Sequence, residues 1–266
     1  MRHVGIIGVG LIGGSFGLAL REAGFDGSIV GVSSTRSITE ARERGAIDSG
    51  VSIEEAAASC DLLFLSQPIS GILATIRELG PLVRPGTLVT DAGSTKRAIV
   101  DEAARSLPGG SFLGGHPMAG KELRGAAAAD AHLFRGRPWV LTSDLDHPIR
   151  KWIAAFGAHE LILDATEHDR LVAWSSHLPQ LASTALAAVL HDHAPDAAKV
   201  AGPGLLDSTR LALSSFDLWR DILDTNQTEV SAALDAYIGK LQSLRTNLQT
   251  DFARGNEFAR SLRQRG

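Results

Sequence analysis

Short apolar runs alternate with amphipathic stretches along the first 165 residues of the chain. The runs are typical of buried strands, and they lie at His3–Ile7, Ser28–Val32, Asp61–Ser66 and Thr87–Asp91. Stretches of helical character come between and after them, at Leu11–Ala23, Thr35–Arg44, Ile69–Leu79 and Thr95–Leu107. Strands without polar alternation that are joined through helices belong to parallel sheets covered on both faces. The pattern therefore predicts a doubly wound parallel sheet, with later strands at Phe112–Leu113, Pro138–Thr142 and Glu160–Leu163.

The pattern changes after residue 165, where no further strands are predicted. We expect a long helix over Glu167–His193 with a kink at Pro179, and then shorter helices at Asp207–Leu213 and Leu218–Leu223. The last long helix, Gln227–Phe252, has apolar residues every three or four positions: Val230, Leu234, Tyr237, Leu241, Leu244 and Leu248. Such a seam packs either within its own domain or between two subunits, and the spacing favours neither. The chain thus divides into an α/β domain, residues 1–165, and an all-helical domain, residues 166–266.

Composition narrows the range of partners. The net charge is −4 and no basic block is present, which argues against nucleic acid or an anionic membrane as the main partner. Cys60 is the single cysteine, so disulfide scaffolds and cysteine-rich zinc sites are excluded. His191 and His193 have no further obvious ligand partner, and no metal site is expected. The N-terminus lacks signal-peptide features and no run approaches the ~18–20 apolar residues of a membrane span, so we expect a soluble, cytoplasmic protein.

A glycine-rich loop follows the first predicted strand. Gly8, Gly10 and Gly13 match the pattern G-x-G-x-x-G, with Leu11 and Ile12 between the last two. The first glycine permits a tight turn, the second lets the backbone approach a pyrophosphate, and the third lets the helix pack on the strand. The loop opens a predicted helix and a second strand follows, which is the context that this motif requires. We therefore expect a Rossmann-type domain that binds a dinucleotide.

The residues after the second predicted strand bear on the cofactor. Enzymes that prefer NAD carry an acidic residue there, which binds the adenosine ribose and repels a 2′-phosphate. This chain has Ser33 and Ser34, with Arg36 close by. Hydroxyl and guanidinium groups are suited to a phosphate. The sequence favours NADP over NAD.

Two glycine-bounded segments carry candidate chemistry. Asp91–Lys96 contains Ser94, and Gly114–Glu122 contains His116; each follows a predicted strand. The carboxyl ends of strands face the ligand in doubly wound folds, so a hydroxyl and an imidazole there are placed to polarise or deprotonate a substrate alcohol. The alternative interpretation is structural, with Ser94 as a helix N-cap and His116 as a loop histidine.

The order of several rare sequence blocks resembles that of the prephenate/arogenate dehydrogenase family, the cyclohexadienyl dehydrogenases. The blocks extend through nearly the whole chain: Gly5–Ser15, Gly114–Glu122, Glu167–Asp169, Ser176–Pro179, Asp207–Arg210 and Leu218–Asp221. The resemblance implies oxidative decarboxylation of a cyclohexadienol dicarboxylate with NAD(P), and dimerisation through the helical domain. The resemblance implies that His116 is the base for the C4 hydroxyl and that Ser94 helps to orient His116 and the hydroxyl. It also implies that Arg210 binds a substrate carboxylate.

The same resemblance implies further residues around the substrate. His177 is expected near the carboxylate pocket, and Glu122 and Asp169 are expected to form an ionic gate with Arg210. No role is expected for His168, which the sequence allows as a helix-surface residue.

Three positions bear on the choice between prephenate and arogenate. Gln180 stands where many family members have a second histidine, and Leu206 stands where a basic residue is common. Ser214 aligns with a residue that is acidic in plant arogenate-specific relatives. Because an ammonium group needs a carboxylate partner, the neutral Ser214 and Gln180 favour prephenate as substrate.

Two other classes remain as alternatives. Rossmann-plus-helical enzymes such as 3-hydroxyacid dehydrogenases and imine reductases share this layout, but the 3-hydroxyacid enzymes use a lysine of the second domain. Here Lys199 and Lys240 are the lysines of that domain, and neither lies in the Asn-x-x-Lys frame. A dinucleotide sensor without turnover would not need His116, Ser94 and Arg210 together.

Overall fold

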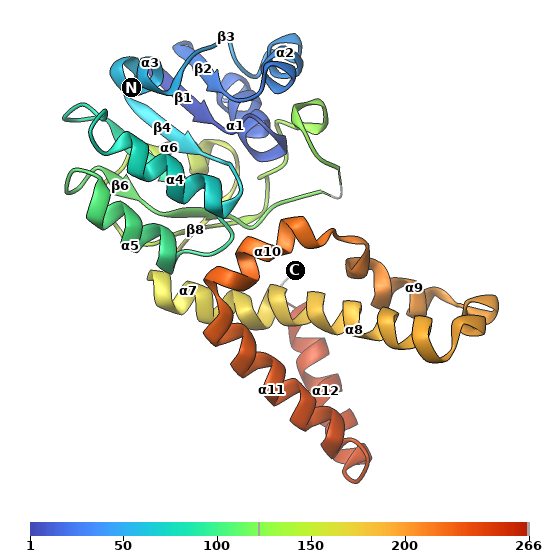
Figure 1. Cartoon of the computed structure of the whole chain (residues 1–266). Coiled ribbons are helices and arrows are strands. Elements are labelled where there is room, and N and C mark those ends of the chain that lie inside the picture. Colours follow the sequence, from blue (N-terminus) through green and yellow to red (C-terminus); the bar gives the residue numbers. More distant parts are fainter. Residues whose placement is uncertain (122, 265–266) are drawn as a thin grey trace.

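A six-stranded parallel sheet forms the centre of the N-terminal domain. The computed structural model describes residues 1–121 and 123–264 (Figure 1). Across the sheet the strands run in the order β3 (Ser49–Gly50), β2 (Ser28–Val32), β1 (His3–Ile7), β4 (Leu62–Leu65), β5 (Leu88–Asp91) and β6 (Phe112–Leu113). All of their pairings are parallel. The order reverses between β1 and β4, so the ligand crevice of this doubly wound sheet is expected at the carboxyl ends of these strands.

A second, three-stranded sheet lies beside the first. It consists of β7 (Gly115–Pro117), β8 (Pro138–Leu141) and β9 (His159–Ile162), with β7 antiparallel to β8. The two later strands predicted at 138–142 and 160–163 therefore exist, but they do not extend the main sheet. Strand β7 was not predicted, because its three residues form no apolar run and Pro117 cannot donate to a ladder.

Helices cover both faces of the main sheet (Figure 1). They are α1 (Leu11–Glu22), α2 (Thr35–Glu43), α3 (Ile53–Ser59), α4 (Ile69–Leu79) and α5 (Arg97–Ser106), whereas α6 (Ile149–Ala155) packs against β9 of the second sheet. Two apolar clusters lie beneath them. Phe16 stacks on Phe64 and contacts Trp139 in one, and aliphatic side chains such as Leu63 and Ile72 form the other. The buried strands thus face apolar layers on both sides, as the sequence predicts.

The C-terminal domain is helical throughout its described residues. Its α-helices are α7 (Ala165–Val172), α8 (Leu178–His193), α9 (Pro203–Thr209), α10 (Phe216–Thr225), α11 (Gln227–Ser243) and α12 (Leu248–Arg263). Helix α7 packs against α5, and α10 packs against α4, so both contacts tie this domain to the sheet domain. The structure agrees with the predicted fold class, a Rossmann-type domain followed by helices.

The expected kink at Pro179 takes the form of a π-helical turn. Residues Ala173–His177 have π-helical hydrogen bonding, and α8 begins directly afterwards at Leu178. Pro179 has no N–H and its ring crowds the carbonyl four residues earlier, which favours a wider turn before it. His177, the last residue of this turn, has a buried side chain.

The long helix predicted over Gln227–Phe252 is wrong in one respect, because it is broken after Ser243. Helix α11 runs away from the sheet domain and α12 turns back towards it (Figure 1). Thr246 and Asn247 favour the turn, since short polar side chains compete for backbone hydrogen bonds. Asp251 on α12 bonds Lys240 at 2.7 Å and Ser243 at 3.0 Å, which fixes the hairpin.

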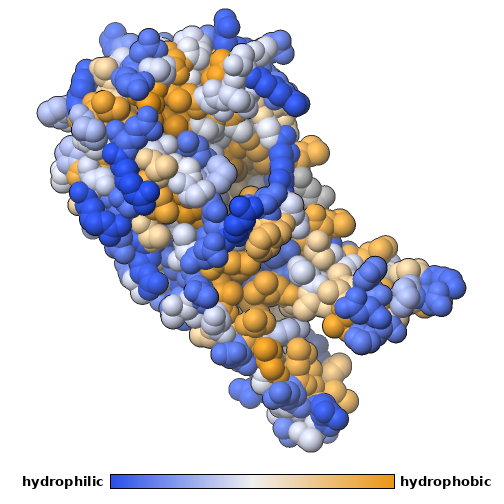
Figure 2. All heavy atoms as spheres, in the orientation of Figure 1, coloured by the Kyte–Doolittle hydropathy of each residue, from blue (hydrophilic) through white to orange (hydrophobic). Residues whose placement is uncertain are grey.

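The predicted apolar seam is fully buried only at its first residue. Val230 is buried and Leu234 is partly exposed, whereas Leu241 is 47% exposed and Leu248, which begins α12, is 57% exposed. Figure 2 shows hydrophobic side chains gathered on the visible face of the helical domain. Large exposed apolar residues occur on several of its helices: Leu186, Val189, Phe216, Leu218, Ile238, Leu241, Leu248, Phe252, Phe258 and Leu262. A surface of this extent is typical of an interface.

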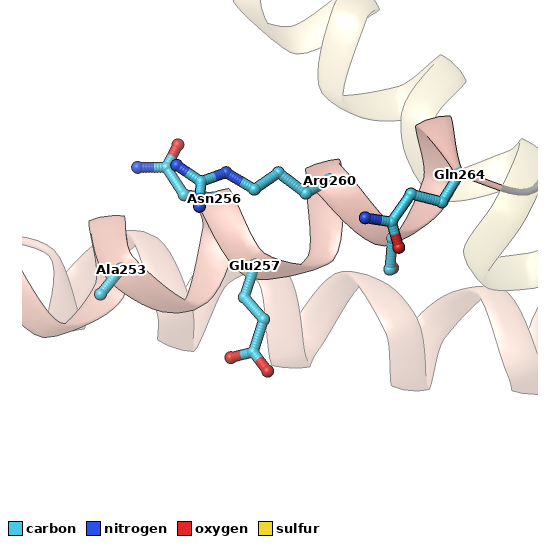
Figure 3. A pocket seen from close by; sticks show the side chains of 6 residues that line it. Ala253, Asn256, Glu257, Arg260 and Gln264 are labelled. Carbon is cyan, nitrogen blue, oxygen red and sulfur yellow. The ribbon is translucent and has the colours of Figure 1, made fainter.

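A hollow on α12 is lined by residues of that helix and by Gln264, which follows it. Its lining residues are Ala253, Asn256, Glu257, Arg260, Ser261 and Gln264, and the long side chains spread to both sides of the helix (Figure 3). None of the predicted site residues lines it. No helix within the described residues is long and apolar enough to span a membrane.

Candidate active site

The glycine loop has the geometry that an anion site requires. Gly8 has a φ of +95°, and a Cβ there would lie 2.7 Å from the side chain of Gln67. A Cβ on Gly13 would lie 2.5 Å from the Gly8 carbonyl oxygen, so that position also excludes a side chain. Gly10 by contrast faces open space. Gly8 therefore permits the turn, Gly13 permits the close packing of α1, and Gly10 leaves room for the ligand to approach.

The start of α1 leaves donors for that anion. Gly10 is its N-cap, no side chain caps the helix, and its first turn has no acidic residue. The backbone N–H groups of Leu11 and Ile12 therefore point out of the helix start together with its positive dipole end. This arrangement fits a pyrophosphate group.

The residues after β2 lie beside the glycine loop. The Gly8 N–H donates to the Val32 carbonyl at 2.9 Å, which places the exposed Ser33 next to the turn. The Ser34 hydroxyl caps α2 by accepting from the Ser37 N–H at 3.3 Å. The side chain of Arg36 is 88% exposed and pairs with Glu40 at 2.8 Å. No acidic side chain stands at residue 33 to repel a 2′-phosphate, in keeping with the sequence.

Two loops at the carboxyl ends of β5 and β6 are held together by a buried ion pair. Lys96 and Asp91 are fully buried and bonded to each other, and Lys96 Nζ also donates to the Gly115 carbonyl at 2.6 Å. Asp91 in turn accepts from the N–H groups of Gly93 at 2.8 Å and Gly115 at 3.0 Å. Burial lowers the pKa of Lys96, and the Asp91 carboxylate opposes that shift. The pair fixes the position from which His116 projects.

His116 ends a line of three hydrogen-bonded side chains. Its Nδ1 lies 2.9 Å from Nε2 of His168, and Nδ1 of His168 lies 2.7 Å from Oδ1 of Asp169. His116 comes from β7, and the other two come from α7, so both domains contribute. His168 is fully buried and Asp169 is 2% exposed, whereas His116 is partly exposed. The expectation that His168 is a helix-surface residue is thus wrong.

The surroundings keep His116 uncharged. Burial, followed by the neighbouring His168 and Lys96, holds the pKa of His116 well below its usual value of 6.5. Because the depressed pKa favours the neutral ring, His116 has a free lone pair at neutral pH. A neutral imidazole at this position can accept a proton from a ligand hydroxyl.

His177 lies behind this line, in contact with α10 and the residue after it. Its ring packs edge-on against Trp219 with the ring centroids 5.8 Å apart, and its Nδ1 lies 3.3 Å from the Asn226 amide nitrogen. The same amide donates to the Asp169 carbonyl at 2.8 Å. Burial lowers the pKa of His177 to about 4, so its ring is neutral at pH 7 and can offer a ligand hydrogen bonding but no positive charge.

Arg210 lies in a turn that α8 supports. It begins the 3-10 helix Arg210–Leu213 and is exposed. The Gln180 amide donates to the Leu211 carbonyl at 2.8 Å, and the Ser183 hydroxyl accepts from the Ala212 N–H at 3.2 Å. Gln180 is 5% exposed, so the structure gives it a supporting contact beneath the Arg210 turn.

The segment that follows His116 contacts the helical domain just before α10. The Arg124 guanidinium donates to the Ser215 hydroxyl at 2.6 Å. Ser214, the neighbouring residue, is exposed, and its N–H donates to the Leu211 carbonyl at 3.0 Å. The chain therefore brings the loop after His116 to the start of α10, close in sequence to Arg210.

Two of the predicted roles find less support in the geometry. Ser94 is partly buried in a bend before α5 and has no hydrogen-bond partner among the described residues, and the N-cap of α5 is Lys96. Both oxygens of Asp169 accept from backbone N–H groups, those of Lys96 at 2.7 Å and Arg97 at 3.0 Å, so this carboxylate lies beneath His168 rather than at a gate. Glu122, the other predicted gate residue, lies outside the described residues.

Comparison with known proteins decides the family. A model for the prephenate dehydrogenase nucleotide-binding domain matches residues 16–156, and one for the prephenate dehydrogenase dimerization domain matches residues 164–264. The chain belongs to the prephenate dehydrogenase family. This family of oxidoreductases in tyrosine biosynthesis includes arogenate and cyclohexadienyl dehydrogenases.

Several relatives match this family member over most of its length. It is 35% identical to prephenate dehydrogenase of Lactococcus lactis over 85% of this chain and 65% of that protein, and 31% identical to the Bacillus subtilis enzyme over 93% and 70%. It is thus shorter than both of these relatives.

Two solved structures share both the fold and the sequence pattern. Prephenate dehydrogenase from A. aeolicus, in complex with hydroxyphenyl propionate and NAD+, has a TM-score of 0.87 and 30% identity over 100% of this chain and 97% of that one. Synechocystis arogenate dehydrogenase has a TM-score of 0.78 and 31% identity over 98% and 96%. A mycobacterial 3-hydroxyisobutyrate dehydrogenase, at 14% identity and a TM-score of 0.51, shares the fold alone. A nicotinamide dinucleotide is therefore the cofactor of the family fold.

Sequence reasoning missed four residues of this prephenate dehydrogenase family site. Asp91 and Lys96 form the buried pair, His168 contacts His116, and Asn226 joins Asp169 to His177. A charged residue at the end of an apolar strand is a usable signal for Asp91, and the Glu167–Asp169 block is one for His168. Nothing in the local sequence marks Asn226.

Proposed function

We propose that the protein catalyses the NAD(P)-dependent oxidative decarboxylation of prephenate to 4-hydroxyphenylpyruvate. In this reaction the C4 hydroxyl loses its proton, hydride leaves C4, and the ring carboxylate departs as CO2 as the ring becomes aromatic. The nicotinamide dinucleotide supplies the hydride acceptor. The single observation that carries the proposal is the neutral His116, whose Nδ1 is bonded to His168 and whose ring stands at the carboxyl edge of the sheet.

Residues of the chain bind the substrate and the cofactor and accept the substrate proton. His116 accepts the hydroxyl proton at Nε2, which general base catalysis requires. Arg210 binds a substrate carboxylate, because a guanidinium pairs with a carboxylate in bidentate geometry. Gln180 and Ser183 support the turn that carries Arg210. The N-terminus of α1 holds the cofactor pyrophosphate.

A spectrophotometric assay tests the proposal. The purified protein is mixed with prephenate and NADP+ or NAD+, and absorbance at 340 nm is followed, with a 3-hydroxyacid as the control substrate. We expect reduced cofactor and CO2 in equal amounts with prephenate and no signal with the 3-hydroxyacid. Cofactor binding without turnover of prephenate or arogenate would instead favour a dinucleotide sensor.

Arogenate is the second candidate substrate, because an arogenate dehydrogenase is among the similar solved structures. Recognition of its ammonium group would need a nearby carboxylate. Ser214 and Gln180 are neutral, and the Asp169 carboxylate is occupied by Lys96, Arg97 and His168. We therefore propose prephenate as the better substrate. A tenfold higher kcat/KM for arogenate, about 1.4 kcal/mol, would refute this preference.

NADP is the cofactor that we propose over NAD. Ser33 lies next to the glycine turn without a carboxylate, and Arg36 is exposed at the start of α2. Ser33→Asp should weaken the use of NADP+ more than that of NAD+, because the new charge repels the 2′-phosphate. Steady-state kinetics of the wild type and this variant with both cofactors is the test, and a clear wild-type preference for NAD+ would count against the proposal.

We also propose a homodimer formed through the helical domain. The exposed seam of α11 and the neighbouring apolar side chains of α12 support it, as does the match of residues 164–264 to a dimerization domain. The domain boundary that we propose lies at residues 165 and 166, where α7 begins.

A further inference from the structure

The orientation of His116 depends on two residues of the other domain. We propose that His168 and Asp169 act as positioning residues that hold His116 in the tautomer protonated at Nδ1, so that its Nε2 is the bare acceptor for the substrate proton. This inference rests on the proposed function, in which His116 is the base. It assigns a chemical task to a histidine for which the sequence suggested none.

The direction of the hydrogen bonds follows from the acceptor at the buried end. An ionised carboxylate can only accept, and Asp169 accepts from the N–H groups of Lys96 and Arg97. Nδ1 of His168 must therefore be the donor in its 2.7 Å contact with Asp169. With its proton on Nδ1, His168 offers Nε2 as the acceptor for Nδ1 of His116 at 2.9 Å. His116 is left with an unprotonated Nε2.

Asp169 is itself held firmly. Its carboxylate lies at the start of α5, which has no side-chain cap of its own, so the aspartate supplies that cap from the helical domain. The favourable helix dipole stabilises the negative charge there. Asn226 fixes the backbone of Asp169 by donating to its carbonyl. The base is thus oriented only where the two domains are docked.

The line also acts after proton transfer. When the O–H bond of the substrate breaks, the proton forms an N–H bond at Nε2 of His116, and the ring becomes an imidazolium. Its Nδ1–H continues to donate to His168, whose own Nδ1–H points at the Asp169 carboxylate. The positive charge is therefore stabilised without any further proton moving along the line.

The test compares two substitutions of His168 with one control. His168→Gln keeps an amide oxygen that accepts from His116 and an amide N–H that donates to Asp169, whereas His168→Phe keeps neither. His191→Phe, on the exposed end of α8, is the control. We expect His168→Phe to lower kcat by ~10²-fold or more, with KM and cofactor affinity nearly unchanged, and His168→Gln to recover much of the loss. A kcat for His168→Phe within about threefold of wild type would overturn the inference, because so small a loss means that His168 does not position the base.

A second measurement does not depend on turnover. Nitrogen-15 NMR of histidine-labelled protein reports which ring nitrogen carries the proton. We expect His116 in the wild type to be protonated at Nδ1 alone near pH 7, and to lose that single tautomer in His168→Phe. A wild-type His116 protonated at Nε2 would overturn the inference even if His168→Phe does not fold. Failure of the wild type to turn over any substrate would refute the proposed function, while the tautomer remains measurable.

Discussion

His147 should make the protein lose stability as the solution is acidified. This residue precedes α6, is 1% exposed, and accepts from the Ile149 N–H through Nδ1 at 3.2 Å. Its Nε2 is buried without a hydrogen-bond partner among the described residues. Burial lowers the pKa of His147 to about 4 from the ordinary value of 6.5. The folded protein therefore resists protonation of a ring that the unfolded chain protonates readily.

The magnitude follows from linkage. Between pH 6.5 and 4 the unfolded state binds more protons than the folded state. The free energy of unfolding therefore decreases as the pH is lowered through this window. At a pH below both pKa values of His147, folded and unfolded, the free energy of unfolding is lower by about 3 kcal/mol. About 2 kcal/mol of this stability is already lost at pH 5. His177, whose pKa is also lowered to about 4, contributes with the same sign.

Urea unfolding at pH 7.5 and pH 5.0 measures this effect. His147→Asn removes the titrating ring but keeps a side-chain oxygen to accept from the Ile149 N–H. The loss of unfolding free energy between the two pH values should be about 2 kcal/mol smaller in this variant than in the wild type. His191→Asn, at an exposed position, should behave as the wild type. An equal loss in His147→Asn and wild type would refute the reasoning.

Three further changes test other parts of the account. Arg210→Gln should raise KM for prephenate at least ~30-fold, because an unpartnered carboxylate costs roughly 2 kcal/mol or more, whereas Arg220→Gln should not; an unchanged KM would place the clamp elsewhere. Leu241→Glu should dissociate the proposed dimer in sedimentation, and a wild type that is monomeric at micromolar concentration would contradict it. Asp221 caps α4 from α10 by accepting from the Ser70 N–H at 2.8 Å. Asp221→Ala should therefore cost about 1 kcal/mol in urea unfolding, and an equal cost for the exposed Asp224→Ala would argue against that cap.

The sheet and the cofactor loop could be predicted from the sequence because their signals are local. A parallel strand such as Leu62–Leu65 is buried on both faces and is therefore apolar at each position. The three loop glycines meet steric limits set by the turn itself. The prediction of the main strands within one or two residues follows from such local constraints.

The polar centre of the site could not be read in the same way. Whether His168 lies on a helix surface or beneath His116 depends on how α7 docks against α5, which no local pattern encodes. The gate role expected for Asp169 finds little support for the same reason, since the N–H groups at the start of α5 donate to its carboxylate. The apolar heptad pattern continues past Ser243 to Leu248 and therefore predicts one long helix. Thr246 and Asn247 compete for backbone hydrogen bonds, and α11 ends at Ser243.

Replacement of His116 by asparagine tests the central claim most directly. The measurement is kcat for prephenate oxidation by the wild type and His116→Asn at saturating cofactor, together with the dissociation constant of the cofactor. If His116 is the base, kcat falls ~10²–10⁴-fold while cofactor affinity changes little, because the glycine loop lies on another strand. Turnover of His116→Asn at the wild-type rate would contradict the account.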